Sequence, residues 1–422
     1  MPKPKLSLPL SVSLLLMLSV SAAAQTRQRT AAGQRTVDAA SFPGADLGAK
    51  INAADRALGA GAGEIVVRGG GRITTQIVVS EGHTLRLTRG VYAPVTTEIP
   101  VLLKSGATIK GDGWETVLLE SIAPGQFVVV SAYNGSRRNE DGDSDITVRD
   151  IQIKGANPGF NSAPQAVALG NCVRCTVDNV WVNATRSIGV QLGGSSAGGK
   201  WAEDSKVINC LFTRVASQNL AMVNGRNILF ENNRFIKAGQ AGGPGSTNID
   251  LEPNMATDRL ENITIRNNFI DVRDSDIPTT GNGILVQSGS GTPHVGPILI
   301  EGNTVIGGSI EGTVTNVLSN GIYVFGVTMR DVTIRNNKVT RTGQAGIRIE
   351  GTRFTVTGNQ FTDIGGGGIP GFYMAASDSR ITNNTLRYSG NGPVDGRILL
   401  IGVTKGNVFS GNAGFAEPEV AR

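Results

Sequence analysis

The sequence predicts an all-β chain that winds into a parallel β-solenoid, with one α-helix closing its N-terminal end. Two observations predict this fold. A short motif of strand, bend and strand recurs ten times between residues 146 and 414, and repeats of this kind stack into solenoids. The composition agrees, because the 422 residues include 57 glycines, only 5% aromatic and only 17% charged residues. Bulky core residues and charged surface residues are both scarce, as suits a stack of narrow repeats.

One position of the motif is asparagine in seven consecutive copies. These residues are Asn233, Asn268, Asn303, Asn337, Asn359, Asn384 and Asn412, which are 35, 35, 34, 22, 25 and 28 residues apart by subtraction. Asparagine tolerates the left-handed backbone of a sharp bend, and stacked carboxamides can bond from one turn to the next. In earlier copies Ile151, Val180 and Cys210 hold the same position and are expected to fill it by packing.

The N-terminal part divides into short segments before the repeats begin. Residues 1–24 are typical of a secretory signal, with lysines before an apolar run and three alanines before Gln25. Residues 25–44 are polar and small and are expected to be flexible. Residues 45–422 form one domain: a capping helix over 45–60, irregular first turns over 64–145, and regular repeats over 146–414. We therefore expect a secreted or periplasmic protein without a membrane span.

Charge and cysteine content narrow the classes of partner. Without the two lysines of the signal the formal charge falls from +5 to +3, and no basic cluster with interleaved aromatics is present, so no nucleic acid partner is expected. Cys172 and Cys175 have CxxC spacing, but with only two histidines in the chain this is no zinc or redox motif. A disulfide among Cys172, Cys175 and Cys210 is one possibility, and buried thiols are the favoured one.

A second series of strands, from 166–170 to 398–402, lies between the motif copies. Their apolar residues alternate into the core, so the residues between them face outward. The outward residues read along the series are Gln191, Ala221, Val223, Asp250, Glu252, Leu285, Gln287, Tyr323, Phe325, Arg348, Glu350, Tyr373, Leu399 and Ile401. The longest intervals between strands flank the middle of this series, and insertions on a solenoid usually gather on its binding face.

The repeat length, short β-branched strands and Asn or Gly corners resemble the right-handed parallel β-helix proteins of the pectin-lyase-like superfamily, over roughly residue 64 to the C-terminus. Gly346 to Glu350 resembles the Gly-x-Arg-Ile-Lys motif of polygalacturonases, with Glu350 in place of lysine. Asn248 to Asp250 resembles their Asn-Thr-Asp, whose acid is catalytic. Their adjacent Asp-Asp pair and Gly-His-Gly are absent from the sequence.

The likeness to lyases is of two kinds. Residues 179–183 resemble a segment of classical pectate lyases, but Asn183 and Ala184 replace its Asp and His. Other β-helix lyases hold Ca²⁺ with acids two apart on one strand. By that analogy Asp250 and Glu252 would bind calcium with Gln287 or Asn219, and Arg348 or His294 would be the base.

Asp250 and Glu252 are the candidate catalytic pair, because residues two apart on a strand place their Cα atoms about 6.6 to 7 Å apart on one face. That spacing suits an acid and a base across a glycosidic bond or two Ca²⁺ ligands; solvated surface charge is the alternative. His294 is a proton shuttle if its loop folds back, and otherwise an exposed loop residue.

Tyr323, Phe325 and Tyr373 suit stacking against sugar rings, or a satellite core beneath loops. Arg348 could pair with a substrate carboxylate or with Glu350, and Gln191 and Gln287 add amides for substrate binding.

The favoured prediction is a monomeric polysaccharide-active enzyme that cleaves a uronate polymer by β-elimination, ahead of hydrolysis with Asp250 and Glu252 as acid and base. A non-catalytic carbohydrate-binding or envelope protein on the same fold is the alternative.

Overall fold

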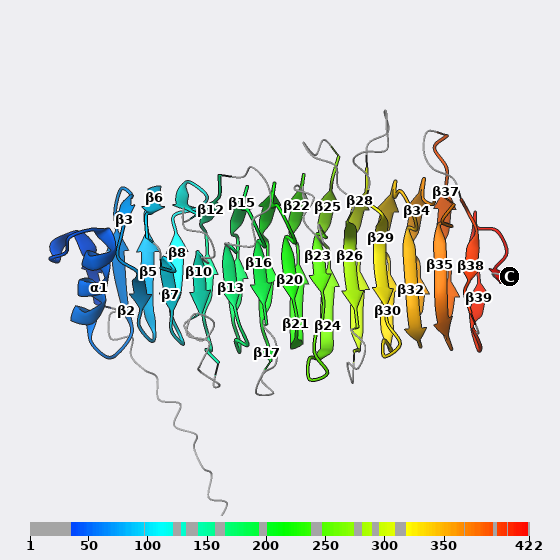
Figure 1. The fold of residues 1–422 in the computed structure, drawn as a ribbon, viewed down its shortest axis with the longest axis horizontal. Coiled ribbons are helices and arrows are strands. Elements are labelled where there is room, and N and C mark those ends of the chain that lie inside the picture. Colours follow the sequence, from blue (N-terminus) through cyan, green and yellow to red (C-terminus); the bar gives the residue numbers. More distant parts are fainter. Residues whose placement is uncertain are drawn as a thin grey trace, which may run out of the picture. The chain divides into compact units, whose positions relative to one another are not determined.

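The computed structural model describes residues 35–96, 98–120, 128–131, 142–156, 165–193, 201–237, 247–273, 281–288, 295–308, 318–366, 368–390, 395–402 and 404–420. In these residues the regular structure is almost entirely β-strand, and the strands form three parallel sheets, which we call A, B and C (Figure 1). The chain visits A, B and C in turn and then returns to A, so each circuit adds one strand to each sheet. The predicted parallel β-solenoid is confirmed.

Sheet A contains β1 (Arg35–Asp38), β2 (Gly63–Val67), β5 (His83–Leu87), β8 (Thr108–Gly111), β11 (Thr147–Arg149), β14 (Thr176–Asp178), β17 (Ala202–Glu203), β18 (Lys206–Ile208), β21 (Gly225–Glu231), β24 (Leu260–Arg266), β27 (Ile298–Glu301), β30 (Val332–Arg335), β33 (Thr355–Thr357), β36 (Arg380–Thr382) and β39 (Val408–Ser410).

Sheet B contains β3 (Gly71–Ile73), β6 (Gly90–Pro94), β9 (Thr116–Leu119), β12 (Gln152–Lys154), β15 (Trp181–Asn183), β19 (Leu211–Thr213), β22 (Arg234–Ile236), β25 (Phe269–Asp271), β28 (Thr304–Ile306), β31 (Lys338–Thr340), β34 (Gln360–Thr362) and β37 (Thr385–Arg387).

Sheet C contains β4 (Ile77–Val79), β7 (Val101–Leu103), β10 (Val129–Ser131), β13 (Val167–Leu169), β16 (Val190–Leu192), β20 (Leu220–Met222), β23 (Ile249–Leu251), β26 (Asn282–Gln287), β29 (Asn320–Phe325), β32 (Ile347–Thr352), β35 (Phe372–Ser377), β38 (Ile398–Leu400) and β40 (Glu419–Val420).

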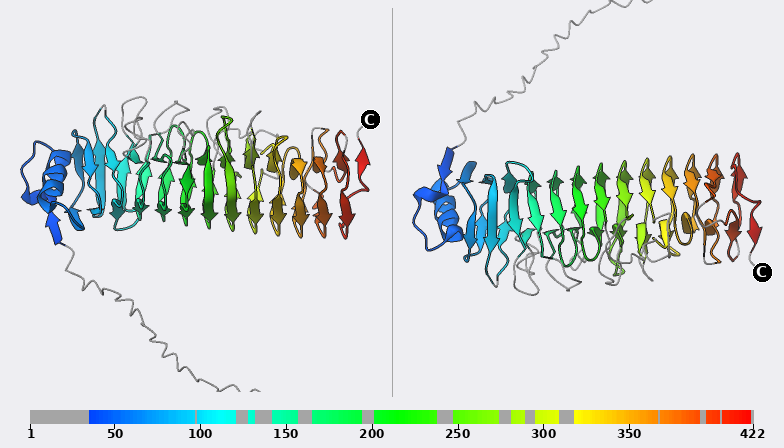
Figure 2. Two further views of the ribbon diagram at one scale, coloured as in Figure 1. Left: turned by 90° about the horizontal axis from the view of Figure 1, so that it is seen from below. Right: turned by 90° about the horizontal axis from the view of Figure 1, so that it is seen from above.

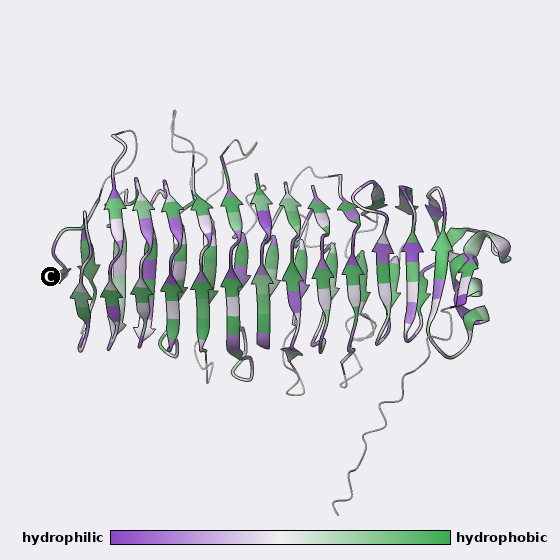
Figure 3. Cartoon of the chain, turned by 180° about the vertical axis from the view of Figure 1, so that it is seen from behind, coloured by the Kyte–Doolittle hydropathy of each residue, from purple (hydrophilic) through white to green (hydrophobic). Residues whose placement is uncertain are grey.

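Each copy of the sequence motif spans one strand of sheet A, a bend, and one strand of sheet B. The same spacing of apolar residues in each copy places one side chain per short strand in a continuous core of Ile, Val, Leu and Phe. Their neighbours face outward, and apolar and polar bands therefore alternate along many strands in Figure 3.

The predicted asparagine ladder is confirmed, but its backbone explanation was wrong. From Asn268 on, the side-chain oxygen of each ladder Asn accepts from both the backbone N–H and the carboxamide of the Asn one turn earlier, as Asn268 does from Asn233 at 3.0 Å each. Asn233 itself accepts from the backbone N–H of Cys210 at 3.0 Å. The left-handed bend belongs to the preceding residue, for example Asn232 with φ 58° and Asn267 with φ 57°. The ladder residues are buried hydrogen-bond hubs, and their exposed neighbours make the turn.

The N-terminal end is closed by α1 (Leu47–Leu58), as predicted, with Ile51 and Ala54 buried against the first turns. Its Asp55 accepts from Ser80 and pairs with the buried His83 at 2.7 Å, tying the helix to sheet A. Figure 2 shows α1 at one end of the strand stack and the last strands at the other.

The expectation of a flexible segment over residues 25–44 was wrong for its second half. Residues 35–44 lie within the described chain, where β1 pairs in parallel with β2 and Val37 packs on the core. A 3-10 turn, η1 (Ala39–Ser41), follows with Asp38 as its N-cap. The cap therefore includes one strand besides the helix, because Val37 sits in register with Ile65. The signal segment and residues 25–34 lie outside the described residues.

A disulfide joins Cys172 and Cys175, so the favoured prediction of free thiols was wrong for this pair. The left-handed backbone at Arg174 (φ 56°) turns the chain back on itself and brings the two Cα atoms to 5.9 Å, within the range a disulfide needs. Cys210 is free and buried, and burial raises the pKa of its thiol to about 12.

Replacing one ladder residue tests how much the amide column contributes. Asn268→Ala removes the acceptor of two Asn233 donors and the carboxamide that donates to Phe230 O and Asn303 Oδ1. Asn303 Oδ1 keeps only the backbone N–H of residue 268 as a donor. Because buried unsatisfied groups cost roughly 1 to 3 kcal/mol each, we expect the free energy of unfolding to fall by about 3 kcal/mol or more in denaturant titrations. Asn267→Gly, at the exposed bend, should change it by less than about 1 kcal/mol. Equal losses would contradict the hub role.

Candidate functional site

The register of sheet C places the predicted polar residues in one outward column. Asp250 pairs with Ala221 on one side and Leu285 on the other. The column in full is Gln191, Ala221, Asp250, Leu285, Tyr323, Arg348, Tyr373 and Leu399. Gln287 pairs with Phe325 in the column beside it, where Glu252 and Glu350 also lie by register. The sequence prediction of one continuous strip on one sheet is therefore confirmed in its geometry.

Asp250 is buried although it faces outward. Asp250 is only 2% exposed, and its neighbours in the column, Ala221 and Leu285, are 8% and 9% exposed. Gln218 donates its side-chain N–H to Asp250 Oδ2 at 3.3 Å, and Oδ1 has no hydrogen-bond partner in the described part of the chain. Burial first, and then the charge of Glu252, raise the pKa of Asp250 to about 7. A solvated surface carboxylate is thereby excluded for Asp250.

Glu252 is partly exposed and continues the strand, since its backbone N–H donates to Met222 O at 2.8 Å. The two carboxyl groups therefore have unlike surroundings, one buried and one in contact with water. Pairs of carboxyl groups whose environments separate their protonation states are the usual basis of acid and base assignment in glycoside-cleaving sites.

A row of asparagine side chains at the N-terminal ends of the sheet C strands, the amide row, supports the strand of Asp250. This row was not identified from the sequence. Asn219 donates to Asn248 Oδ1 at 3.3 Å, Asn248 donates to Asn282 O at 3.3 Å, and Asn320 donates to Asn282 Oδ1 at 2.9 Å. These residues stand at or just before the first residues of β20, β23, β26 and β29, so aligning the sheet C strands by their start would have revealed the row. It fixes the strand that carries Asp250.

Further along the column an arginine is held between two aromatic rings. The guanidinium carbon of Arg348 lies 4.7 Å from the ring centroid of Tyr323 and 4.4 Å from that of Tyr373. The rings of Tyr323 and Phe325 stack at 4.4 Å with an interplanar angle of 22°. In the described part of the chain Arg348 has no ion pair with Glu350 and no hydrogen-bond acceptor. The guanidinium therefore lies between two rings, and among the described residues its N–H groups have no acceptor.

The two halves of the strip are separated along the solenoid axis. Arg348 is three strand steps from Asp250 by register, about 14 Å at the usual spacing of parallel strands. Tyr373 is one step further, and Gln191 lies two steps from Asp250 on the other side. Only a ligand as long as an oligosaccharide can touch Asp250 and Arg348 together. His294 lies outside the described residues.

The donors around Asp250 are few for a metal ion. Ca²⁺ takes six to eight oxygen ligands, and the described residues contain no group of three or more His, Cys, Asp and Glu side chains placed to hold a metal. Asp250 Oδ1 lacks a partner, but only Glu252 and the amide of Gln287 stand nearby in the strip. We therefore derive no chemical step through calcium.

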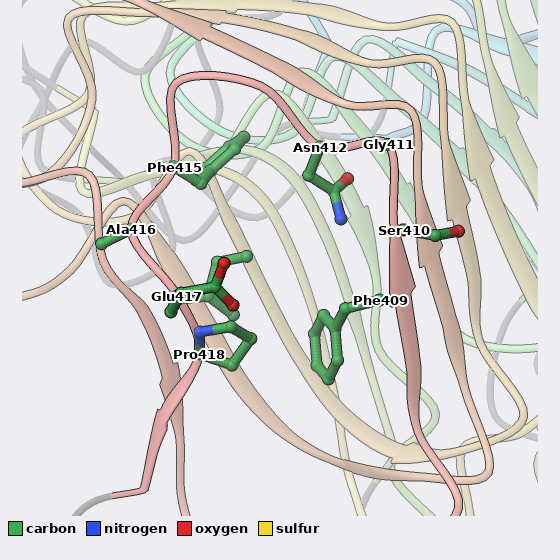
Figure 4. Close-up of a pocket in the computed structure, with 9 residues that line it drawn as sticks. Phe409, Ser410, Gly411, Asn412, Phe415, Ala416, Glu417 and Pro418 are labelled. Atoms are coloured by element: carbon green, nitrogen blue, oxygen red, sulfur yellow. The ribbon is translucent and has the colours of Figure 1, made fainter.

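A separate pocket lies at the C-terminal end of the stack (Figure 4). Its volume is about 190 Å³, and Phe409, Phe415, Ile398 and Pro418 contribute apolar walls. These residues belong to the last turn, where the core has no further strand to cover it. The pocket shares no residue with the strip, although its Ile398 adjoins Leu399, the last residue named in the column, on β38.

Comparisons with known proteins define the class of fold. The family model described as the right handed beta helix region matches residues 139–315 and 310–416, more than half of the chain. The chain therefore belongs to the right-handed β-helix family. A search of curated protein sequences finds no significant match.

Similar solved structures share the fold at low sequence identity. The A-module of the mannuronan C-5 epimerase AlgE4 from Azotobacter vinelandii superposes with a TM-score of 0.59 at 16% identity, covering 91% of this chain and 99% of that one. An exopolygalacturonase from Thermotoga maritima gives 0.56 at 12% identity, covering 90% and 92%. The Dettilon tailspike protein gives 0.52 at 16% identity, covering 92% and 68%. These likenesses, together with the family match, confirm the right-handed parallel β-helix fold predicted from the sequence.

None of the helices in the described part of the chain is long and apolar enough to span a lipid bilayer.

Replacing Asp250 should change how stability depends on pH. An unfolded Asp has a pKa near 3.9, so between about pH 4 and the folded pKa of about 7 the folded chain keeps a proton that the unfolded chain has lost. The free energy of unfolding should therefore fall as the pH rises across this interval, in total on the order of 4 kcal/mol. Asp250→Asn should abolish the fall and be the more stable form at pH 8, measured by denaturant titration.

The companion variant separates the two causes. Glu252→Gln removes the like charge but keeps the burial, so the fall in stability should persist over a narrower pH interval. Parallel pH profiles for the parent and Asp250→Asn would show that Asp250 titrates as an ordinary carboxyl group.

Proposed function

We propose that this chain is an exported enzyme that cleaves glycosidic bonds of an acidic polysaccharide on the outer face of sheet C. The observation that carries the proposal is the pair Asp250 and Glu252: one carboxyl group is buried with its pKa raised to about 7, and the other is partly exposed beside it. Similar folds belong to an epimerase of mannuronan and an exopolygalacturonase, which supports a polysaccharide as the ligand class.

Hydrolysis follows directly from this arrangement. Asp250, protonated near neutral pH, donates its proton to the glycosidic oxygen as the bond from that oxygen to the anomeric carbon breaks. Glu252, which is partly exposed, accepts a proton from the water whose oxygen bonds to the anomeric carbon. The products are two sugar chains with one water added, and the proton on Glu252 returns to Asp250 through solvent.

Uronate β-elimination, favoured from the sequence, is the second candidate. It is supported by Arg348, whose N–H groups are free for a carboxylate, because elimination requires one beside the proton that is removed. It needs an ionised base near the sugar, however, and Asp250 holds its proton up to about pH 7. Arg348 is also three strand steps away, so the acid–base pair favours hydrolysis.

Loss of either carboxyl group tests the assignment. Asp250→Asn and Glu252→Gln should each lower kcat on a polysaccharide that the parent cleaves by about 10²-fold to 10⁴-fold. Glu301→Gln, on the outer face of sheet A and paired with Arg335, is the matched control and should retain full activity. Release of reducing ends and absorbance of unsaturated ends should be measured on polygalacturonate, alginate and a neutral glucan.

The pH profile and a chelator distinguish the mechanisms. With Asp250 as general acid, activity should fall as the pH rises above about 7, with reducing ends and no unsaturated products, and EDTA should have no effect. Unsaturated products lost on adding EDTA would replace hydrolysis by calcium-dependent elimination. Unimpaired cleavage by the Asp250→Asn variant would eliminate both, and absence of cleavage on every polymer would favour a non-catalytic binding protein.

Arg348 should set the preference for acidic sugars. Arg348→Gln removes a charged donor to a substrate carboxylate, a bond worth roughly 1.5 to 3 kcal/mol, so KM for oligogalacturonides should rise by about tenfold with kcat little changed. The same variant should treat carboxyl-reduced oligosaccharides as the parent does. Arg335→Gln on sheet A is the charge-matched control, and an equal rise in KM for both kinds of substrate would refute the carboxylate contact.

A further inference from the structure

The outer faces of the three sheets carry different charge patterns. On sheet A, basic and acidic side chains of adjacent strands neutralise one another, as Arg266 does with Glu231 and Arg335 with Glu301, both at 2.7 Å. On sheet C the outward charges are mostly acidic. Most outward charges of sheet A thus lie in cross-strand ion pairs, which are common on exposed sheets. Among the described residues Lys206 and Arg380 are exposed exceptions without an ion pair.

Sheet B carries several cations that have no acidic partner among the described residues. From β12 to β37 its outward basic residues are Lys154, Arg234, Lys338 and Arg387, all exposed. In the described part of the chain none of these four side chains has an ion pair or a hydrogen-bond acceptor. The only acid in these nine strands is Asp271, which pairs with Arg273 at 2.7 Å. The face therefore has an excess of positive charge that the protein does not use internally.

Aromatic rings lie on the same face and are held in place. Trp181 pairs in register with Gln152 and Leu211, and its indole N–H donates to Thr213 Oγ1 at 2.7 Å. Trp114, 36% exposed, donates its indole N–H to Asn179 O at 2.9 Å. The two rings are 5.7 Å apart and tilted by 55°. Because both N–H groups are satisfied by the protein, the rings offer only their apolar surfaces to a ligand.

The column continues with the same two chemistries. Leu211, Arg234 and Phe269 follow Trp181 in register, and the guanidinium of Arg234 lies 5.1 Å from the Phe269 ring centroid. Towards the far end a hollow of about 120 Å³ is lined by Gln360, Phe361, Thr362, Thr385 and Arg387. Hydroxyl, amide and guanidinium groups line this hollow, which suits a hydroxylated anionic ligand.

We propose that the outer face of sheet B is a second binding surface, on which an acidic polysaccharide lies along the solenoid axis. Pyranose rings would stack on Trp114 and Trp181, and carboxylates or sulfates would meet the four cations, none of which has an acidic partner among the described residues. Arg234 already lies over the Phe269 ring, which holds its guanidinium in place. From β12 to β37 the face spans eight strand steps, about 38 Å at the usual strand spacing. A nucleic acid fits poorly, since four cations spread over that length are too sparse for its closely spaced phosphates.

This surface is distinct from the strip on sheet C and does not depend on the proposed catalysis. It would hold the polymer beside the molecule whether or not Asp250 is catalytic. The ligand class is inferred from two features that occur together on this face: aromatic rings held in place by hydrogen bonds, and cations that have no acidic partner among the described residues.

Affinity electrophoresis of the full chain tests the proposal, with native gels containing polygalacturonate, alginate or neutral pullulan. The parent should be retarded by both polyuronates and not by pullulan. Arg234→Gln/Lys338→Gln/Arg387→Gln should weaken the apparent affinity by at least tenfold, and Trp181→Ala should weaken it severalfold. Mobilities are normalised to a gel without polysaccharide, and the melting temperature of each variant is compared with that of the parent.

The matched control removes the same charge from another face. Lys110→Gln/Arg266→Gln/Arg335→Gln on sheet A lowers the net charge equally and should leave the retardation unchanged. Equal weakening by the two triple variants would mean attraction by net charge alone and would overturn the proposal, as would an unretarded parent. Arg348→Gln on sheet C should keep the retardation while changing KM, so this surface and the proposed active site can fail separately.

Discussion

Strand register is the constraint on which the other features of this molecule depend, and the buried asparagine ladder at the corner between sheets A and B enforces it. Within the ladder, a carboxamide such as that of Asn268 accepts two hydrogen bonds from the turn before and donates to the turn after. A slip of one residue would invert the facing of every side chain in a short strand and would leave buried amides without partners. The ladder therefore ensures that successive strands of one sheet point their side chains at equivalent positions in the same direction.

Fixed register turns a one-dimensional sequence into columns of side chains. Gln191, Asp250, Tyr323, Arg348 and Tyr373 come from a stretch of the chain more than 180 residues long, yet they form one line because each occupies the same place in its strand. The same rule places Trp181, Arg234 and Phe269 in line on sheet B. Chemistry on this fold is thus set by which residue each repeat places at an outward position.

The fixed strand register also explains which features the sequence could predict. Periodicity alone identified the repeats, the capping helix and the outward column, because all three depend on local pattern. It could not show that Asp250 is buried although it faces outward, since that depends on what lies over the strand. Nor could it show that Arg348 stacks between two tyrosines in place of pairing with Glu350. Tyr323 and Tyr373 lie on the neighbouring strands and Glu350 on the same strand, and only side-chain packing decides between them. Gln218, the hydrogen-bond partner of Asp250, lies 32 residues away and carries no motif.

The burial of Asp250 has a consequence for how such a strip works. A carboxyl group that faces outward and yet lies in a dry setting keeps its proton to about pH 7 at a cost in stability once the proton is lost, which is the usual relation between active-site chemistry and fold stability. The solenoid tolerates that cost because each turn contacts only its neighbours. Asp250 lies between Ala221 and Leu285, and the amide row anchors its strand. The cost of the buried carboxylate is therefore confined to a few turns. The outward charges of sheets A and B are exposed and carry no such cost. On sheet A the protein's own side chains supply most of the counter-charges, and on sheet B a bound ligand would supply them.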